Sequence, residues 1–300
     1  MEKIIEKLSK FLTIEQIKFN EPLKNYTSFK IGGPAKILVT PFYFDEISKI
    51  INICREENKR YYLLGKGTNV LASDKGFDGV IILMSENLSH IELHENRITA
   101  CAGAKLSKVA LLAKENSLSG FEFAHGIPGT IGGAVTMNAG AYDGEIKNVL
   151  EDVLVLTPEG EIKELKNKEM ELGYRTSIIA KENLIVLQAT IKLELAPQDN
   201  ITKKMQDFIQ KRKNKQPLNY PSAGSTFKRP TGYFAGKLIE DAGLSGFRVG
   251  NAAVSEKHCG FVVNLGNATC EDVLILIQEV KKNVYEKFGV MLEEEIKMLN

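Results

Sequence analysis

The stretch Gly126-Ile127-Pro128-Gly129-Thr130-Ile131-Gly132-Gly133-Ala134-Val135-Thr136-Met137-Asn138-Ala139-Gly140-Ala141-Tyr142 is the most informative part of this 300-residue sequence. Seven of the 25 glycines fall between residues 120 and 144. Glycine loses more conformational entropy on folding than any other residue, so such a concentration needs a physical reason. Tight turns in a sheet would explain it, and so would close approach of the backbone to a ligand. We favour the ligand.

A second glycine-rich stretch, Gly65-Lys66-Gly67-Thr68-Asn69, follows an apolar run that predicts a strand. Successive backbone N–H groups in such a turn can surround a phosphate, and the side chains of Thr68 and Asn69 add donors. The stretch matches neither the dinucleotide-binding fingerprint nor the P-loop. An ordinary turn at the end of a strand explains it equally well. Two glycine-rich loops in one chain nevertheless favour a large phosphate-bearing cofactor.

Three further segments carry reactive side chains. Tyr174-Arg175-Thr176-Ser177 offers a guanidinium that can bind a carboxylate or phosphate through two hydrogen bonds. Leu292-Glu293-Glu294-Glu295-Ile296 offers carboxyl groups near the end of the chain. Read alone, both segments are equally compatible with ordinary surface structure, an exposed loop for the first and a charged edge strand for the second.

The third segment, Pro221-Ser222-Ala223-Gly224-Ser225-Thr226-Phe227-Lys228-Arg229-Pro230, places hydroxyls and two cations between prolines. This composition suits a site for an anionic substrate, although a surface turn bounded by prolines would look the same. A nucleophilic serine is not indicated, because Gly224-Ser225 lacks the G-x-S-x-G pattern and no histidine lies nearby in the sequence.

Composition excludes several classes of function. The chain has 39 Lys+Arg and 38 Asp+Glu, so its formal net charge of +1 gives no electrostatic basis for binding nucleic acid. No apolar run is long enough to span a membrane, and the charged N-terminus lacks a secretory signal, so we expect a cytoplasmic location. The four cysteines and four histidines are dispersed without C-x-x-C spacing, so we expect free thiols and no metal site.

The hydrophobic pattern predicts a mixed fold. Apolar spacing predicts helices near residues 4–12, 47–54, 106–113, 201–213 and 270–288. Short apolar runs predict strands at 61–64, 80–83, 153–156, 162–165 and 184–195, the third and fourth forming a hairpin. Asp45 is expected to cap the second helix, and Thr269 with Asp272 resembles a capping box in which Asp replaces Glu or Gln. Residues 195–200 look like a linker, so we expect a boundary near 196–202.

Together these segments resemble the UDP-N-acetylenolpyruvoylglucosamine reductases, and the resemblance runs from Asn25 to Glu295. It depends chiefly on Gly126–Tyr142 and on Ser222–Lys228. The resemblance implies an α+β fold with an FAD-binding unit of the vanillyl-alcohol-oxidase type in two subdomains, followed by a smaller α+β substrate-binding domain. We place the FAD-binding domain at residues 1–197 and the substrate-binding domain at residues 198–300.

The resemblance also implies roles for individual residues. Arg175 matches the family's active-site arginine, Ser225 its proton donor and Glu295 its C-terminal acid. Tyr174, Lys215 and Arg229 match positions expected to contact substrate. The residues expected to bind FAD are Gly65, Gly67, Thr68, Asn69, Gly129, Thr130, Gly132 and Gly133.

The activity implied is reduction of an enolpyruvyl ether on UDP-N-acetylglucosamine to the lactyl ether of UDP-N-acetylmuramate, a step of peptidoglycan precursor synthesis. Non-covalent FAD would mediate the reduction, NADPH would supply the hydride, and the UDP-linked enolpyruvyl sugar would be the partner. No nucleic acid or membrane is expected as a partner, and the sequence does not determine the oligomeric state.

Two departures from the family pattern and two alternatives remain. Glu294 stands where the family commonly has proline, so the position of Glu295 follows from its spacing from Leu292. Eight residues separate Arg175 from Leu184, which leaves no room for a substrate-capping insertion and indicates the shorter type of the family. An oxygen-using FAD oxidase of the same fold is one alternative. His125, beside the glycine-rich stretch, is a candidate covalent anchor for its FAD, but a structural or solvated histidine is the more common case. A non-catalytic nucleotide-binding scaffold is the other.

Overall fold

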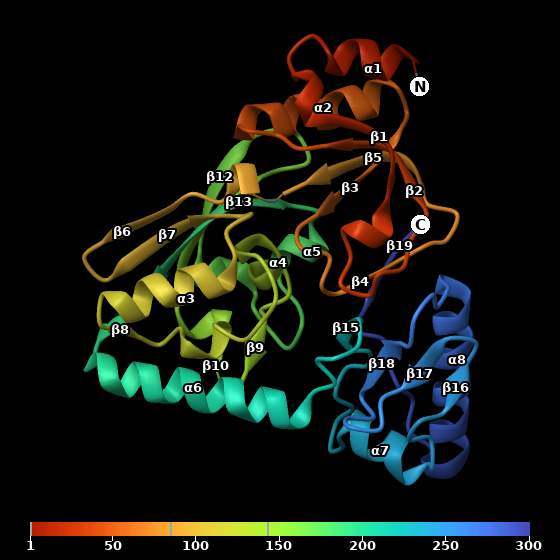
Figure 1. Cartoon of the computed structure of the whole chain (residues 1–300). Helices are drawn as coiled ribbons and strands as arrows, with labels where there is room; N and C mark the ends of the chain where they lie inside the picture. Colours follow the sequence, from red (N-terminus) through yellow and green to blue (C-terminus); the bar gives the residue numbers. More distant parts are fainter. Residues whose placement is uncertain (1, 85, 143) are drawn as a thin grey trace. The chain divides into compact units, whose positions relative to one another are not determined.

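The computed structural model describes residues 2–84, 86–142 and 144–300 (Figure 1). The helices are α1 (Glu2–Leu8), α2 (Phe44–Glu56), α3 (Leu106–Glu115), α4 (Ile131–Thr136), α5 (Ile178–Lys181), α6 (Gln198–Lys215), α7 (Ala235–Asp241) and α8 (Cys270–Phe288). None of them, in the described ranges, is long and apolar enough to cross a membrane.

The strands alternate irregularly with the helices. The first eight are β1 (Ile17–Pro22), β2 (Pro34–Val39), β3 (Arg60–Leu64), β4 (Val70–Ala72), β5 (Phe77–Leu83), β6 (Ile91–His94), β7 (Arg97–Cys101) and β8 (Leu118–Ser119). The next six are β9 (Gly140–Ala141), β10 (Gly144–Glu145), β11 (Leu150–Leu156), β12 (Ile162–Lys166), β13 (Ile185–Lys192) and β14 (Glu194–Leu195). The last five are β15 (Ser222–Ser225), β16 (Arg248–Val249), β17 (Ala252–Val254), β18 (Phe261–Asn264) and β19 (Lys297–Leu299).

The chain forms two compact units, each assembled from three separate stretches. The first unit contains residues 1–17, 39–66 and 82–212, and the second contains residues 18–38, 67–81 and 213–300. Most of α6 therefore belongs to the first unit. The predicted assignment of residues 1–197 to FAD and 198–300 to substrate is a functional division, and it stays a prediction.

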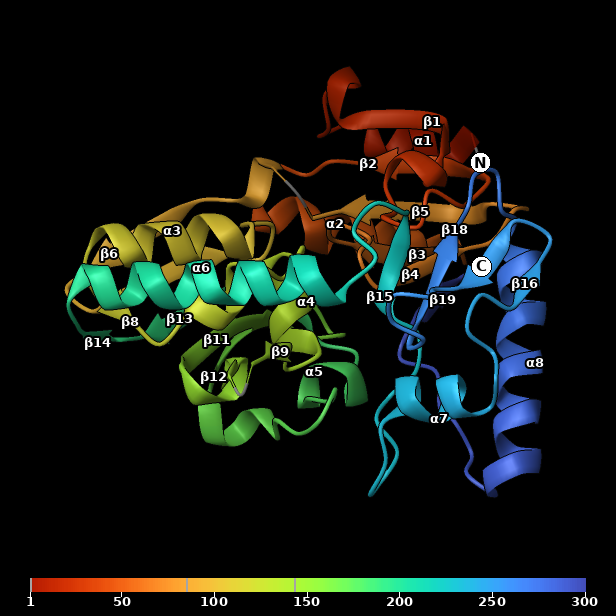
Figure 2. The same cartoon turned by 60° about the horizontal axis from the view of Figure 1, so that its bottom comes forward.

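The first unit contains a five-stranded antiparallel sheet in the order β12-β11-β13-β7-β6. The predicted hairpin is confirmed, because Val153 lies opposite Leu165 and Leu156 opposite Ile162. Helix α4, in the glycine-rich stretch, packs against β13. Helix α6 runs alongside α3 in both views (Figure 1 and Figure 2), and Gln198 donates a hydrogen bond to the Lys114 carbonyl at 3.0 Å. A separate four-stranded sheet has the order β1-β2-β5-β3.

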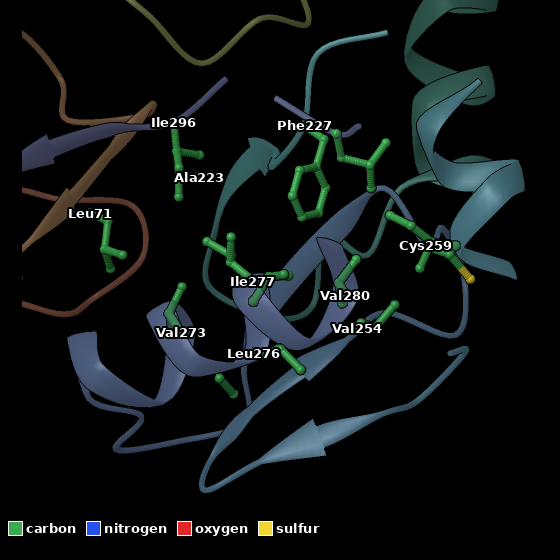
Figure 3. Close-up of a cluster of buried hydrophobic side chains, with 14 of the residues drawn as sticks. Leu71, Ala223, Phe227, Val254, Cys259, Val273, Leu276, Ile277, Val280 and Ile296 are labelled. Atoms are coloured by element: carbon green, nitrogen blue, oxygen red, sulfur yellow. The ribbon is translucent and has the colours of Figure 1, made fainter. Parts of the chain in front are cut away.

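The second unit contains an antiparallel sheet in the order β15-β18-β17-β16 and a parallel pair formed by β4 and β19. Helix α8 packs on β16 and β17 and also contacts α7. Its buried stripe of Val273, Leu276, Ile277, Val280 and Val284 faces a shared hydrophobic core (Figure 3). That core also includes residues that flank the predicted site in the sequence, namely Ala223, Phe227, Leu292 and Ile296.

Most predicted elements are present, with shifts at their ends. The first helix ends at Leu8 rather than continuing to residue 12, and residues 184–195 form two strands rather than one. The predicted linker is shorter, because Leu195 still belongs to β14 and α6 begins at Gln198. The capping box at α8 is confirmed: Thr269 Oγ1 accepts a hydrogen bond from the Asp272 N–H, and Asp272 Oδ2 accepts one from the Thr269 N–H, each at 3.0 Å.

The cap predicted for the second helix is wrong. Tyr43, not Asp45, occupies the N-cap position of α2. The Glu46 carboxylate accepts hydrogen bonds from the N–H groups of Phe42 and Tyr43 at 2.7 and 3.4 Å, so it takes the part expected of Asp45. Asp45 lies in the first turn and pairs instead with Lys49 at 2.8 Å. A carboxylate there still interacts favourably with the helix dipole.

Candidate active site

Gly65, at the start of one glycine-rich stretch, lies against the other glycine-rich stretch within the first unit. A Cβ atom built on Gly65 would lie 2.7 Å from Thr130 Oγ1, so the backbone that follows β3 touches the start of α4 only because residue 65 has no side chain. Within the ranges that the structure describes, the backbone N–H groups of Lys66, Gly67 and Thr68 donate no hydrogen bond to protein. Successive free N–H groups of this kind suit an anionic ligand.

Gly67 is also required by the protein itself. Its φ of +60° lies in the left-handed region, and a Cβ there would collide with the Tyr26 carbonyl oxygen. The Gly67 carbonyl accepts a hydrogen bond from the Ser28 N–H at 3.0 Å. The turn is therefore fixed by the second unit's own contacts and leaves its N–H groups available.

Neighbouring glycines at the start of α4 differ in what surrounds them. A Cβ on Gly132 would lie 2.9 Å from Ala102 Cβ, so residue 132 is small because of internal packing. A Cβ on Gly133 would have only Thr130 Oγ1 near it, at 3.8 Å, and Gly133 is exposed. Thr130 is the N-cap residue, but its side chain accepts no capping hydrogen bond from the described helix. Gly133 and the Thr130 hydroxyl thus remain available to a ligand.

The end of the glycine-rich stretch holds the loop that carries Arg175. Asn138 is 1% exposed, and its Nδ2 donates a hydrogen bond to the Gly173 carbonyl at 3.1 Å. Beyond the arginine, fully buried Ser177 donates from Oγ to the Thr136 carbonyl at 2.7 Å. Both ends of the loop are therefore fastened to residues 136–138. Sequence reasoning assigned no role to Asn138, because its partner Gly173 lies 35 residues away and its positive φ is visible only in the structure.

The loop itself is a tight turn. Gly173 and Thr176 exchange backbone hydrogen bonds of 3.1 and 3.3 Å, and Arg175 has a φ of +56°. The Arg175 guanidinium carbon lies 5.1 Å from the centroid of the exposed Tyr174 ring. Left-handed backbone at a residue with a long side chain carries strain, and such strain is concentrated at functional sites. The predicted pair Tyr174 and Arg175 is thus presented together by one constrained turn.

In the second unit, the structure places Ser225 at the end of β15, opposite Phe261 of β18. The strand has an irregular register between Ser222 and Ser225. The next residue, Thr226, is buried and anchors the backbone: its N–H donates to the Gly260 carbonyl at 2.8 Å, and its Oγ1 accepts from the Val262 N–H at 3.0 Å. Ser225 is therefore held on a rigid piece of backbone.

The segment that contains Glu295 pairs with this strand. The Glu295 N–H donates to the Thr226 carbonyl at 2.8 Å, and the Lys228 N–H donates to the Glu293 carbonyl at 2.8 Å. Buried Leu292 and Ile296 fix the segment in the core. The structure thus brings the backbone segments that carry Ser225 and Glu295 side by side, although they lie about 70 residues apart in the sequence.

The remaining candidates are more exposed. Lys215 is the last residue of α6, and Arg229 places its guanidinium carbon 4.6 Å from the Phe234 ring centroid. Glu294, at the position where the family has proline, forms an ion pair with Lys281 at 2.7 Å. The Glu294 carboxylate is therefore already paired with a lysine, and the role of C-terminal acid stays predicted for Glu295. The substrate contacts of Lys215 and Arg229 stay predictions.

Burial lowers the pKa of two of the histidines. One is His125, whose Nδ1 is buried without a hydrogen-bond partner in the described chain. The other is His258, whose Nδ1 accepts a hydrogen bond from the Gly260 N–H at 3.1 Å. In residues 2–84, 86–142 and 144–300, His, Cys, Asp and Glu form no group of three suited to a metal ion.

Comparison with known proteins agrees with this geometry. The profile of the UDP-N-acetylenolpyruvoylglucosamine reductase C-terminal domain matches residues 216–299, and that of the FAD binding domain matches residues 35–166. The chain is 51% identical over 296 residues to UDP-N-acetylenolpyruvoylglucosamine reductase from Clostridium novyi (strain NT), covering 99% of this chain and 96% of that protein. It is 52% identical over 298 residues to the reductase from Caldanaerobacter subterraneus subsp. tengcongensis, covering 99% and 98%.

Solved structures give the same result. The crystal structure of the reductase from Thermus caldophilus superposes with a TM-score of 0.81 at 36% identity, covering 93% of this chain and 98% of that one. Alkyldihydroxyacetonephosphate synthase superposes with a TM-score of 0.51 at 17% identity over 66% of this chain, which is a likeness of fold alone. The predicted α+β class and the FAD-binding fold of the vanillyl-alcohol-oxidase type are confirmed.

Proposed function

The chain belongs to the UDP-N-acetylenolpyruvoylglucosamine reductase family, and we propose that it reduces the enolpyruvyl ether of UDP-N-acetylglucosamine to UDP-N-acetylmuramate. It is a flavin-dependent oxidoreductase of peptidoglycan precursor synthesis. The observation that supports the residue assignments best is the backbone hydrogen bond from the Glu295 N–H to the carbonyl of Thr226, the residue that follows Ser225. NADPH as hydride donor and a cytoplasmic location stay predictions.

The residues of the glycine-rich stretches fit a bound FAD. Free N–H groups at Gly67 and Thr68 suit its pyrophosphate, and the Thr130 hydroxyl and the open face of Gly133 lie where a ligand could contact them. Gly65, Gly129 and Gly132 keep the surrounding backbone closely packed. When bound, FAD supplies the hydride chemistry of the reaction.

The chain's own residues supply charge and a proton. Arg175 stabilises the negative charge that develops on the substrate carboxylate as its neighbouring double bond is reduced, because a guanidinium binds a carboxylate through two hydrogen bonds. Glu295, in its protonated form, donates a hydrogen bond to the same developing charge. Ser225 then gives its hydroxyl proton to the carbon that carries the ether oxygen. Serine is a weak acid, but an enolate is basic enough to accept this proton when the two are aligned.

A visible spectrum of the purified protein tests this function first. Bound flavin gives absorbance in the visible region, anaerobic NADPH should remove it, and the UDP-linked enolpyruvyl sugar should restore it. Reoxidation by air at the rate of substrate turnover would support the oxidase instead. A protein with neither flavin absorbance nor NADPH oxidation would be a scaffold.

A further inference from the structure

Asn69 has a contact that its predicted role in cofactor binding does not explain. Its Nδ2 donates a hydrogen bond to the Glu295 carbonyl at 3.0 Å, and its own backbone carbonyl accepts one from the Lys297 N–H at 2.9 Å. We propose that Asn69 is a positioning residue that holds Glu295 in place for the reduction. This inference rests on the proposed function of Glu295.

The pairing of β4 with β19 shows why a side chain is needed. The parallel ladder begins with Lys297 opposite Val70 and continues to Leu299, so its register stops short of Glu295. Asn69 immediately precedes β4, and its carboxamide supplies one more hydrogen bond beyond the end of the ladder. The side chain therefore extends the restraint to the residue that carries the acid.

Both peptide groups of Glu295 are consequently fixed. Its N–H donates to the Thr226 carbonyl and its carbonyl accepts from Asn69 Nδ2. Because Thr226 follows Ser225, one restraint comes from the proton donor's strand and the other from the first glycine-rich loop. Buried Leu292 and Ile296 prevent the segment from pivoting away. The Glu295 carboxyl then extends from a Cα atom with little freedom, and misplacement of a catalytic group by 1 Å can cost about 10²-fold in rate.

The chemical identity of residue 69 follows from this contact. The neutral carboxamide has an N–H donor that can reach a carbonyl oxygen. Aspartate has the same shape but offers only acceptors when ionised, so it would turn an attraction into a repulsion between two oxygens. Asn69→Asp thus removes the contact without opening a cavity.

Asn96 provides a matched control in the first unit. Its Nδ2 donates to the Leu193 carbonyl at 2.9 Å, and its carbonyl accepts from the Leu193 N–H at 2.9 Å. The arrangement repeats that of Asn69, but it involves none of the predicted site residues. Asn96→Asp therefore reports what loss of such a contact does to the protein in general.

Measurements on the flavin-containing protein test the proposal. Per molecule of bound flavin, reoxidation of Asn69→Asp by the enolpyruvyl substrate should slow by about 10- to 100-fold, and this slowing should exceed any change in its rate of reduction by NADPH. Adding Glu295→Gln should slow Asn69→Asp little further, because both changes act through one carboxyl group. Amide hydrogen exchange in residues 293–299 should be faster in Asn69→Asp and unchanged in Asn96→Asp.

Other outcomes overturn the proposal in distinguishable ways. Loss of FAD with unchanged exchange in residues 293–299 would make Asn69 a cofactor ligand, as the sequence predicts. If reoxidation by substrate slows equally in Asn96→Asp, the slowing is a general consequence of losing such a hydrogen bond and is not due to Glu295. If the substrate fails to reoxidise even the wild-type flavin, the proposed function is wrong, while unchanged hydrogen exchange in Asn69→Asp would separately refute the restraint on Glu295.

Discussion

The glycine-rich segment of the first unit, residues 126–142, and the serine–glutamate region of the second, residues 222–228 and 292–297, are built in opposite ways. The first depends on residues without side chains: Gly132 allows Ala102 to pack against the backbone, and Gly133 leaves space beside the helix for a ligand. The second depends on donors that are present. Ser28 Oγ donates to the Ser222 carbonyl at 2.6 Å, and Asn69 Nδ2 donates to the Glu295 carbonyl.

This difference predicts which substitutions each region tolerates. In the glycine-rich segment, added atoms should interfere with packing or with the cofactor. In the serine–glutamate region, removed hydrogen-bond donors should interfere with catalysis while the cofactor stays bound. Half-reactions and FAD retention are therefore the measurements that separate the two regions.

Ser225→Ala should have the largest effect. Reduction of the flavin by NADPH needs no proton from Ser225, so it should be unchanged, but reoxidation by the enolpyruvyl substrate should slow by roughly 10²–10⁴-fold. Anaerobic stopped-flow absorbance measures both steps. Ser222→Ala, in the same strand, is the control and should leave both rates near those of the wild type. Equal slowing of both steps in Ser225→Ala would show that Ser225 is not the proton donor.

Asn138→Ala tests a part of the glycine-rich segment that depends on side-chain hydrogen bonds. It removes one of two donors to the Gly173 carbonyl, which still accepts from the Thr176 N–H, and it removes the acceptor of the Lys147 N–H, so the loss of these partly buried hydrogen bonds should cost about 1 kcal/mol. The free energy of unfolding, measured with denaturant, should fall accordingly. The loop of Arg175 should also loosen, so reoxidation by substrate should slow more than reduction by NADPH. Unchanged stability would mean that water replaces Asn138 at no cost.

Gly133→Val and Gly132→Val distinguish a glycine that leaves space for a ligand from a glycine that internal packing requires. Gly133→Val should lower FAD affinity about tenfold or more, equivalent to about 1.4 kcal/mol, with little change in stability of the cofactor-free protein. Gly132→Val also forces Ala102 aside, so it should cost about 1–3 kcal/mol of stability even without FAD. Normal flavin content in Gly133→Val would remove this face from the cofactor site.

The sequence predicted those parts of the fold that depend on local pattern. The hairpin of β11 and β12 follows from alternating apolar residues around a Pro-Glu-Gly turn, and α8 follows from its capping box and apolar stripe. The predicted Asp45 cap was wrong because the Glu46 carboxylate, one residue later, accepts the hydrogen bonds from the N–H groups of Phe42 and Tyr43. The helix begins at Phe44, so Asp45 lies inside the first turn and Glu46 stands at the third helical position, from which its carboxylate accepts from the N–H groups that precede the helix.

The roles of the site residues stay predictions, and the hydrogen bonds that hold these residues in place were not predicted from the sequence. Arg175, Ser225 and Glu295 stand in recognisable motifs, whereas Asn138 and the Asn69 contact depend on residues 35 and 226 positions away. Such partners are brought together only by the tertiary fold, and a sequence read without aligned relatives contains no signal for the pairing. The division of the chain into units that interleave three stretches each was missed for the same reason.

Thr269→Ala should have the smallest effect, because it removes a donor–acceptor pair of the second unit that does not involve Ser225 or Glu295. Thr269 Oγ1 caps α8 in the second unit, and Asp74 separately accepts hydrogen bonds from the Cys270 N–H at 2.8 and 3.0 Å. Removing an N-cap hydroxyl typically costs about 1 kcal/mol, and the remaining Asp74 contacts should keep the helix start in place. Stability should therefore fall slightly while FAD retention and both half-reactions stay unchanged. A selective loss of reoxidation would show that α8 transmits strain to Glu295 through the shared core, and that donors throughout the second unit, rather than those at Ser225 and Glu295 alone, control the reaction.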